Sequence, residues 1–116
     1  MANVLKEKSK KFAVRVVGVY KHLCDNKREY IMSKQLVRSG TSIGANVYEA
    51  LQGQSRADFI AKMSIALKEA AETGYWLELL HETGYLSDCE YQSVQNDCEE
   101  VVKLLTSIIK SSREKS

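Results

Sequence analysis

Apolar residues recur at intervals of three and four along four long stretches of the chain, and no proline interrupts any of them. This spacing places the apolar side chains on one face of an α-helix, whose period is about 3.6 residues. Proline is the commonest breaker of helix interiors, and the turns of all-β folds use it often. The spacing and the lack of proline together predict an all-α protein.

Four helices are expected, over residues 4–24, 32–51, 55–83 and 87–111. Ser55 with Asp58, and Ser87 with Glu90, stand at the spacing of residues that cap the N-terminus of a helix. Short loops between long helices favour antiparallel neighbours. The 116 residues suit one domain. We therefore expect residues 1–116 to form a single antiparallel up-down-up-down four-helix bundle.

The composition is that of a globular protein, with 44% hydrophobic and 28% charged residues and a net charge of only +2. No apolar run approaches the roughly 18 residues of a membrane-spanning helix. Residues 1–8 are charged early and lack the apolar core of a signal peptide. These features predict a cytoplasmic protein without a membrane partner.

Residues that could support catalysis or bind metal are scattered. His22 and His81 lie on different predicted helices. A di-metal bundle site needs Glu-x-x-His on two helices, whereas this chain has it once, at Glu78 to His81. The three cysteines lack metal-site spacing, and no phosphate-binding glycine loop is present. We expect no enzymatic activity, no metal and no cofactor, and no small-molecule substrate is evident.

Charge is divided unevenly along the chain. Residues 1–38 hold ten Lys or Arg and three Asp or Glu, whereas residues 69–102 hold nine Asp or Glu and no Lys or Arg. One interpretation is a basic surface that binds nucleic-acid phosphates. The other, favoured because charge runs on helices usually face solvent, is a solvated face or a contact between basic and acidic helices. The candidate nucleic-acid-binding residues are Lys8, Lys11, Arg15, Lys34 and Arg38.

Residues 38–49 are poor helix material in the middle of the predicted second helix. Gly40 and Gly44 are four apart, which predicts close packing of another helix, and we expect the same of Gly74 in the third helix. Polar residues form a parallel stripe that is either a buried hydrogen-bonded network or a ligand-contacting patch. The residues of this stripe are Ser39, Ser42, Asn46 and Glu49.

At the same segment the chain resembles a known family. The run from Gln35 to Asn46, continued by Glu49 and Ala50, is similar to the signature of small bacterial four-helix-bundle proteins encoded in intervening sequences of 23S ribosomal RNA genes. The resemblance covers roughly residues 10–110. Further matching segments are Ser55 to Phe59, Lys68 and Glu69 with Glu72, Tyr75 to Leu77, and Thr83 to Leu86.

The resemblance implies an antiparallel bundle that assembles with its own copies into a ring, a pentamer. Most members of the family have no assigned activity. A related group, the accessory proteins of diversity-generating retroelements, binds nucleic acid through a basic surface. The expected function is therefore a homo-oligomeric scaffold or interaction module, and the alternative is an accessory protein that binds RNA or DNA through the first two helices.

Overall fold

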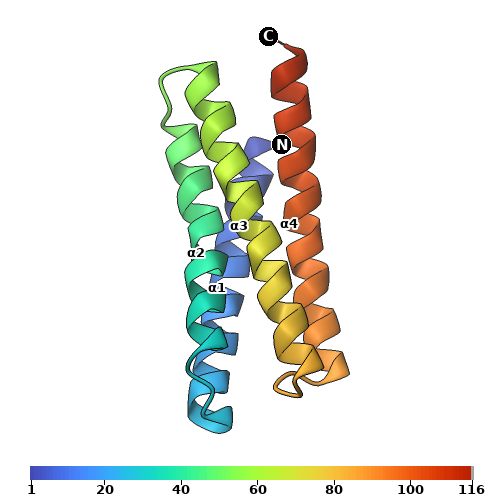
Figure 1. Cartoon of the computed structure of the whole chain (residues 1–116). Helices are drawn as coiled ribbons and strands as arrows, with labels where there is room; N and C mark the ends of the chain where they lie inside the picture. Colours follow the sequence, from blue (N-terminus) through green and yellow to red (C-terminus); the bar gives the residue numbers. More distant parts are fainter. Residues whose placement is uncertain (116) are drawn as a thin grey trace.

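The protein is a bundle of four α-helices in the computed structural model, which describes residues 1–115. The prediction of an all-α fold is confirmed. Successive helices run in opposite directions (Figure 1), and the bundle measures 47 × 20 × 19 Å. Ser116, the last residue of the expected domain, lies outside the described residues. The helices are α1 (Ala2–Lys27), α2 (Met32–Leu51), α3 (Arg56–Glu82) and α4 (Asp88–Glu114).

The first and last helices are longer than the sequence predicts. The polar residues after Cys24 stay helical, and α1 ends only at Arg28, which adopts the left-handed conformation with φ 55° and ψ 36°. At the other end of the chain, α4 continues past residue 111 to Glu114. Polar residues do not by themselves stop a helix.

The starts of α3 and α4 are held by hydrogen bonds between residues close in sequence. Ser55 Oγ accepts the backbone N–H of Asp58 at 3.1 Å. Ser87 Oγ accepts the N–H of Glu90 at 3.1 Å, and Glu90 Oε1 accepts the N–H of Ser87 at 2.8 Å. These bonds satisfy N–H groups that have no partner within a helix.

One apolar core runs the length of the bundle, and the helices surround it in the order α1–α2–α3–α4. Each helix contacts its two neighbours in this cycle, and in the described chain no diagonal pair of helices approaches within 8 Å between Cα atoms. The α1–α4 interface and the α2–α3 interface therefore lie on opposite sides of the bundle. None of the described helices has the length and apolar content needed to cross a membrane.

Candidate functional site

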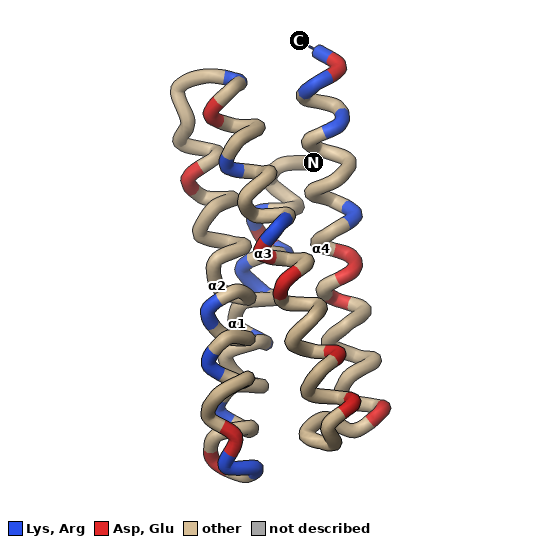
Figure 2. The backbone as a smooth tube through the Cα atoms, in the orientation of Figure 1, with Lys and Arg blue, Asp and Glu red and all other residues tan. Residues whose placement is uncertain are grey.

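Lys and Arg are frequent along α1 and α2, whereas Asp and Glu are frequent along α3 and α4, as the coloured backbone shows (Figure 2). Two of the candidate nucleic-acid-binding residues, both on α1, contact acidic residues of α4 at the α1–α4 interface. Lys8 forms an ion pair with Glu100, whose hydrogen bond and charge raise the pKa of Lys8. Arg15 donates to Asp97 Oδ2 and to Ser93 Oγ, both at 2.6 Å. These two cations are therefore engaged by α4.

The other three candidates are not paired with α4, although Lys11 lines the same α1–α4 groove as Lys8. Lys11 pairs at 3.3 Å with Glu7 of its own helix. Arg38 lies at the α2–α3 interface, 3.6 Å from Glu72 Oε2. Lys34 is exposed and forms no ion pair within residues 1–115.

The structure does not bring the five candidate residues into one basic surface. Lys8 and Arg15 belong to the α1–α4 interface, and Arg38 belongs to the α2–α3 interface on the opposite side. Each of the three faces a carboxylate of a neighbouring helix, so much of its charge is neutralised within the chain. These residues therefore fit the interpretation of the charge pattern in which basic helices contact acidic ones.

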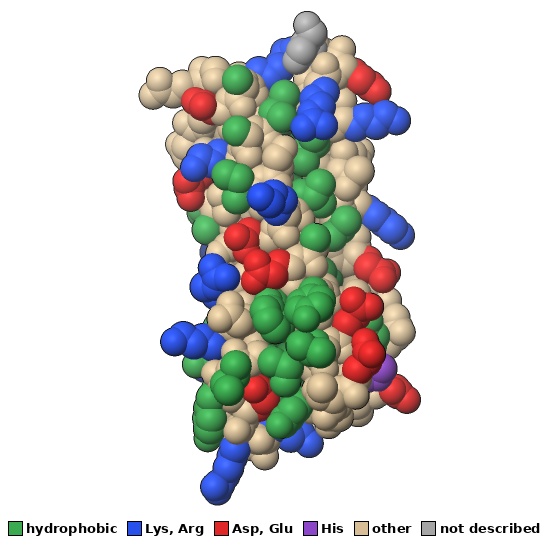
Figure 3. Space-filling model, in the orientation of Figure 1, with side chains coloured by type: hydrophobic (Ala, Val, Ile, Leu, Met, Phe, Trp, Pro, Cys, Tyr) green, Lys and Arg blue, Asp and Glu red, His purple; other side chains and the backbone are tan. Residues whose placement is uncertain are grey.

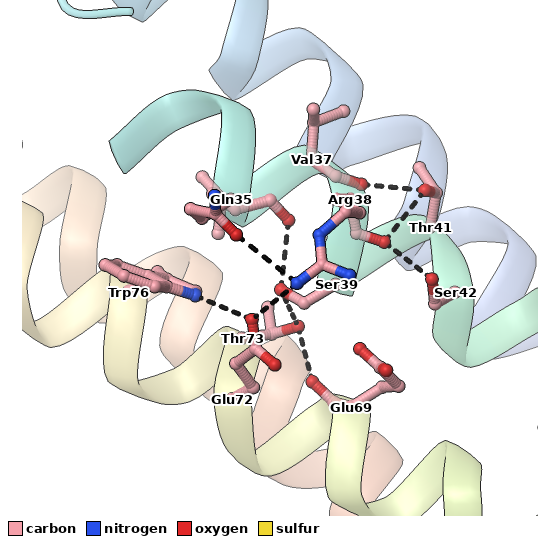
Figure 4. Close-up of polar contacts among 11 residues, drawn as sticks. Gln35, Val37, Arg38, Ser39, Thr41, Ser42, Glu69, Glu72, Thr73 and Trp76 are labelled. Carbon is pink, nitrogen blue, oxygen red and sulfur yellow. Dashed lines mark hydrogen bonds and ion pairs between the residues drawn. The ribbon is translucent and has the colours of Figure 1, made fainter. Parts of the chain in front are cut away.

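Glu72 joins polar and aromatic side chains of α2 and α3 in a cluster at the surface (Figure 4). Its Oε2 accepts the indole N–H of Trp76 at 3.0 Å and faces Arg38. Arg38 also donates to Gln35 Oε1 at 3.3 Å. Tyr75 meets Trp76 edge-on, with 5.0 Å between ring centroids, and is 54% exposed. Arginine, tyrosine and tryptophan are the residue types enriched at the centres of protein interfaces.

A buried hydroxyl pair lies beneath this cluster. Thr73 Oγ1 of α3 is 2.9 Å from Ser39 Oγ of α2, and both side chains are fully buried. Ser39 donates to the carbonyl of Leu36 at 3.3 Å, and Thr73 Oγ1 also lies 2.8 Å from the carbonyl of Glu69. Spacing alone places Thr73 on an apolar face, and no signal in the sequence marked its hydroxyl as the partner of Ser39.

The remaining residues of the predicted polar stripe do not join this buried pair. Ser42 donates to the carbonyl of Arg38 at 2.7 Å, and Asn46 donates to the carbonyl of Ser42 at 2.8 Å. Both bonds stay within α2. Glu49 is exposed and pairs with Lys62 at 2.9 Å. The stripe therefore divides into one buried residue, two residues bonded to their own helix and one surface ion pair.

The glycines of α2 face α1. A Cβ on Gly40 would lie 2.7 Å from Val16 Cγ1, so a side chain there would collide with the core of the bundle. A Cβ on Gly44 would lie 3.5 Å from the backbone oxygen of Ser9, an ordinary contact distance. The close contact expected at Gly74 is absent within the chain, because the nearest atom to its Cβ position is in the side chain of Gln95 at 3.7 Å.

Glu29 organises the loop between α1 and α2. Its carboxylate accepts the backbone N–H groups of Ile31, Met32 and Ser33 at 3.1, 3.0 and 2.7 Å. Burial raises the pKa of Glu29, but these hydrogen bonds lower it more, so the net pKa is below its ordinary value. The loop thereby holds Tyr30 and Ile31 outward, 59% and 79% exposed. Sequence reasoning missed this role of Glu29, although an acid before a helix start is a known capping signal.

Residues 2–107 of the chain match the family of the 23S rRNA-intervening sequence protein. The chain belongs to this family. It is also similar to a crystal structure of a protein of unknown function from the S23 ribosomal protein family of Bacteroides thetaiotaomicron. The two share 60% sequence identity with a TM-score of 0.93, over 94% of this chain and 97% of the other. No curated protein matches the chain. The family resemblance of the sequence is confirmed.

Two of the reactive side chains are paired or buried, whereas the thiol of Cys89 is exposed. His81 Nε2 lies 2.6 Å from Asp88 Oδ1, and its ring stacks on Tyr91. Burial raises the pKa of the Cys98 thiol to about 12, which keeps it protonated near neutral pH. Within residues 1–115, no group of three or more His, Cys, Asp or Glu residues could hold a metal ion.

Proposed function

We propose that this intervening-sequence protein is a non-enzymatic interaction module that works as an assembly of its own copies. The observation that carries the proposal is apolar surface left outside a filled core. Val14 of α1 is 67% exposed, and Tyr75, Ile65 and Tyr48 are also exposed on α3 and α2. Figure 3 shows a contiguous group of apolar side chains on one face of the bundle, beside acidic ones. Contiguous exposed apolar groups mark interaction sites.

The proposed assembly is a ring, with the five copies that the resemblance implies. The proposed location is the cytoplasm, where the free thiols of Cys24, Cys89 and Cys98 would stay reduced. As a scaffold, such a ring would present the same surface several times, and repeated presentation raises avidity for a partner without new contacts.

Size-exclusion chromatography with light scattering tests the proposal. The purified chain is expected to elute at micromolar concentration with a mass several times the 13.1 kDa of one chain. Dilution should reduce that mass only when the concentration falls below the dissociation constant of the assembly. A constant mass of 13.1 kDa at all concentrations contradicts self-assembly.

The second candidate function is nucleic-acid binding, and the α1–α2 loop is the observation that favours it. Lys27, Arg28 and Lys34 lie within four residues of the exposed Tyr30 in the sequence and form no ion pair within the described chain. Cations beside an exposed aromatic ring suit the phosphates and bases of a single strand. This site shares only Lys34 with the residues proposed from the sequence.

Charge reversal tests the second candidate. The variant Lys27→Glu/Lys34→Glu should lose binding to single-stranded RNA and DNA oligonucleotides, and the binding constant of the wild type should fall steeply with salt. The control variant, Lys68→Glu/Lys110→Glu, changes two exposed lysines of α3 and α4 and alters net charge by the same amount. Equal loss in both variants would point to net charge alone, and no binding by the wild type at low salt would reject this function.

A further inference from the structure

Two glycines in helix interiors have no packing role within the chain. A Cβ on Gly18 of α1 would meet nothing within 4 Å, and a Cβ on Gly74 of α3 would meet only the side chain of Gln95, at 3.7 Å. Each glycine costs about 1 kcal/mol of helix stability relative to alanine. The collision with Val16 accounts for Gly40, but no contact inside the bundle accounts for these two.

Gly74 lies in a groove between α3 and α4. The groove has a volume of about 350 Å³, and the residues that line it beside Gly74 include the small Ala70 and Ala71 and the longer Gln95. Its apolar lining suits an apolar segment that is narrow enough to reach Gly74. The small and apolar lining residues are Ala70, Ala71, Gly74, Tyr75, Cys98 and Val102.

The rim of the α3–α4 groove is acidic. Glu78 and Glu99 line it, both are exposed, and neither forms an ion pair within residues 1–115. Burial raises the pKa of nearby Tyr91, and the charges of Glu78, Glu99 and Glu82 raise it further. Lys103 is the one base among the lining residues. A segment that fills this groove should therefore be apolar along its centre and basic at its edges.

The outer stripe of α1 has this chemistry. Lys10, Val14, Gly18 and Lys21 follow one another at intervals of four, four and three, so they share one face of the helix. Val14 is 67% exposed. Lys10 and Lys21 are exposed and form no ion pair in the described part of the chain. The stripe and the groove share no residue, so one copy can use both at once.

We propose that the α1 stripe of one copy lies in the α3–α4 groove of the next copy, with Gly18 and Gly74 at the points of closest approach. This inference rests on the proposed self-assembly and names the two faces that meet. The faces are complementary but not identical, so the contact is heterologous. Repetition of a heterologous contact joins copies head to tail and closes into a ring when the rotation permits. Val14 would fill the centre of the contact, and the lysines would meet the rim carboxylates.

Two variants that each block one face test the proposal. Val14→Asp places a charge at the centre of the stripe, and Gly74→Leu fills the groove. Each variant alone is expected to elute as a monomer of about 13.1 kDa, several-fold below the mass of the wild type. Mixed in equal amounts, the two variants should form a one-to-one heterodimer, because each keeps the face that the other has lost.

Matched controls separate these effects from general ones. Ala45→Asp and Ala61→Leu make the same kinds of change at exposed positions of α2 and α3 outside both faces, and both variants should assemble as the wild type does. Circular dichroism confirms that each variant is folded. If Gly74→Leu fails to fold, Glu78→Lys/Glu99→Lys blocks the groove instead, and it should reassemble when mixed with Lys10→Glu/Lys21→Glu.

Each outcome decides one point. A monomeric wild type rejects self-assembly itself. Variants that keep the mass of the wild type leave self-assembly standing and overturn the assignment of these two faces. If each variant forms a dimer without the other variant present, the contact is isologous. A mixture that stays monomeric shows that the two faces do not bind each other.

Discussion

The hydroxyl of Thr73 on α3 lies 2.9 Å from the hydroxyl of Ser39 on α2, in a core that is mostly apolar. Ser39 donates its proton to the carbonyl of Leu36, so its oxygen can accept the one proton of Thr73, which also lies within reach of the carbonyl of Glu69. Both hydroxyls are fully buried, and a shift of α3 along α2 would leave each with only the carbonyl of its own helix. The pair therefore favours one axial register of α2 against α3.

Loss of this pair should lower stability. Thr73→Val keeps the shape of the side chain but removes the donor, and we expect the free energy of unfolding to fall by about 1–2 kcal/mol. Because Ser39 and Thr73 contact each other, the double variant with Ser39→Ala should cost less than the sum of the single variants, by about 0.5–1 kcal/mol. Urea denaturation at one fixed protein concentration measures all three values.

The control for the hydroxyl pair is Thr106→Val. Thr106 is exposed and donates to the carbonyl of Val102 at 2.8 Å, so it makes the same kind of bond within its own helix but has no partner across helices. Its loss should change stability by less than about 0.5 kcal/mol. Additive effects of Ser39→Ala and Thr73→Val would contradict coupling across the α2–α3 interface.

The two glycines of α2 should respond in opposite directions to alanine. In Gly40→Ala the new Cβ collides with Val16, which is fully buried and cannot turn away, so stability should fall by about 1–3 kcal/mol. Gly44→Ala meets only an ordinary contact and gains helix propensity, so stability should stay the same or rise by up to about 1 kcal/mol. Thermal and urea unfolding compare the two variants. Equal responses would show that Val16 is not the cause.

Acid should weaken the α1–α2 loop through Glu29. The pKa of this carboxyl is lowered in the folded state, so its contribution is present above the unfolded pKa of about 4.3 and is lost as pH falls through the folded pKa. Glu29→Gln should lower stability near neutral pH by about 1–3 kcal/mol, because three N–H groups lose a charged acceptor. The variant should also lose less stability than the wild type on acidification.

Unfolding measured from neutral to acidic pH tests the role of Glu29. Glu49→Gln serves as its control, because Glu49 is exposed and pairs only with Lys62 on the surface. This control should change stability by no more than about 1 kcal/mol. If Glu29→Gln keeps the full acid dependence of the wild type, the carboxylate does not act as described.

The cysteines should differ in reactivity. Cys98 is buried and its pKa is raised to about 12, so little thiolate forms at mildly alkaline pH. Cys89 is exposed at the start of α4. Iodoacetamide should therefore modify Cys89 in the folded protein and Cys98 only after denaturation. Peptide mass spectrometry over time distinguishes the two sites, and equally fast labelling of both would show that the core opens readily at Cys98.

Local signals account for much of what could be predicted. The spacing of apolar residues predicts α2, which runs from Met32 to Leu51. The serines before α3 and α4 can be recognised as caps from the sequence, because each accepts the backbone N–H of the residue three positions later. The end of α1 had no such signal. Arginine has no preference for the left-handed conformation of Arg28, and the carboxylate of Glu29 is aimed at α2 only once the chain has turned.

The sequence by itself determined the all-α fold and which side of each helix carries charge, because both follow from periodicity within a single helix. Only the tertiary structure decided which charges meet. The ion pair of Arg15 with Asp97 and that of Arg38 with Glu72 join residues far apart in the chain. Such pairs depend on the order of helices around the core and on their axial register. That order divides the predicted basic residues between opposite sides of the bundle and leaves the outer stripe of α1 exposed.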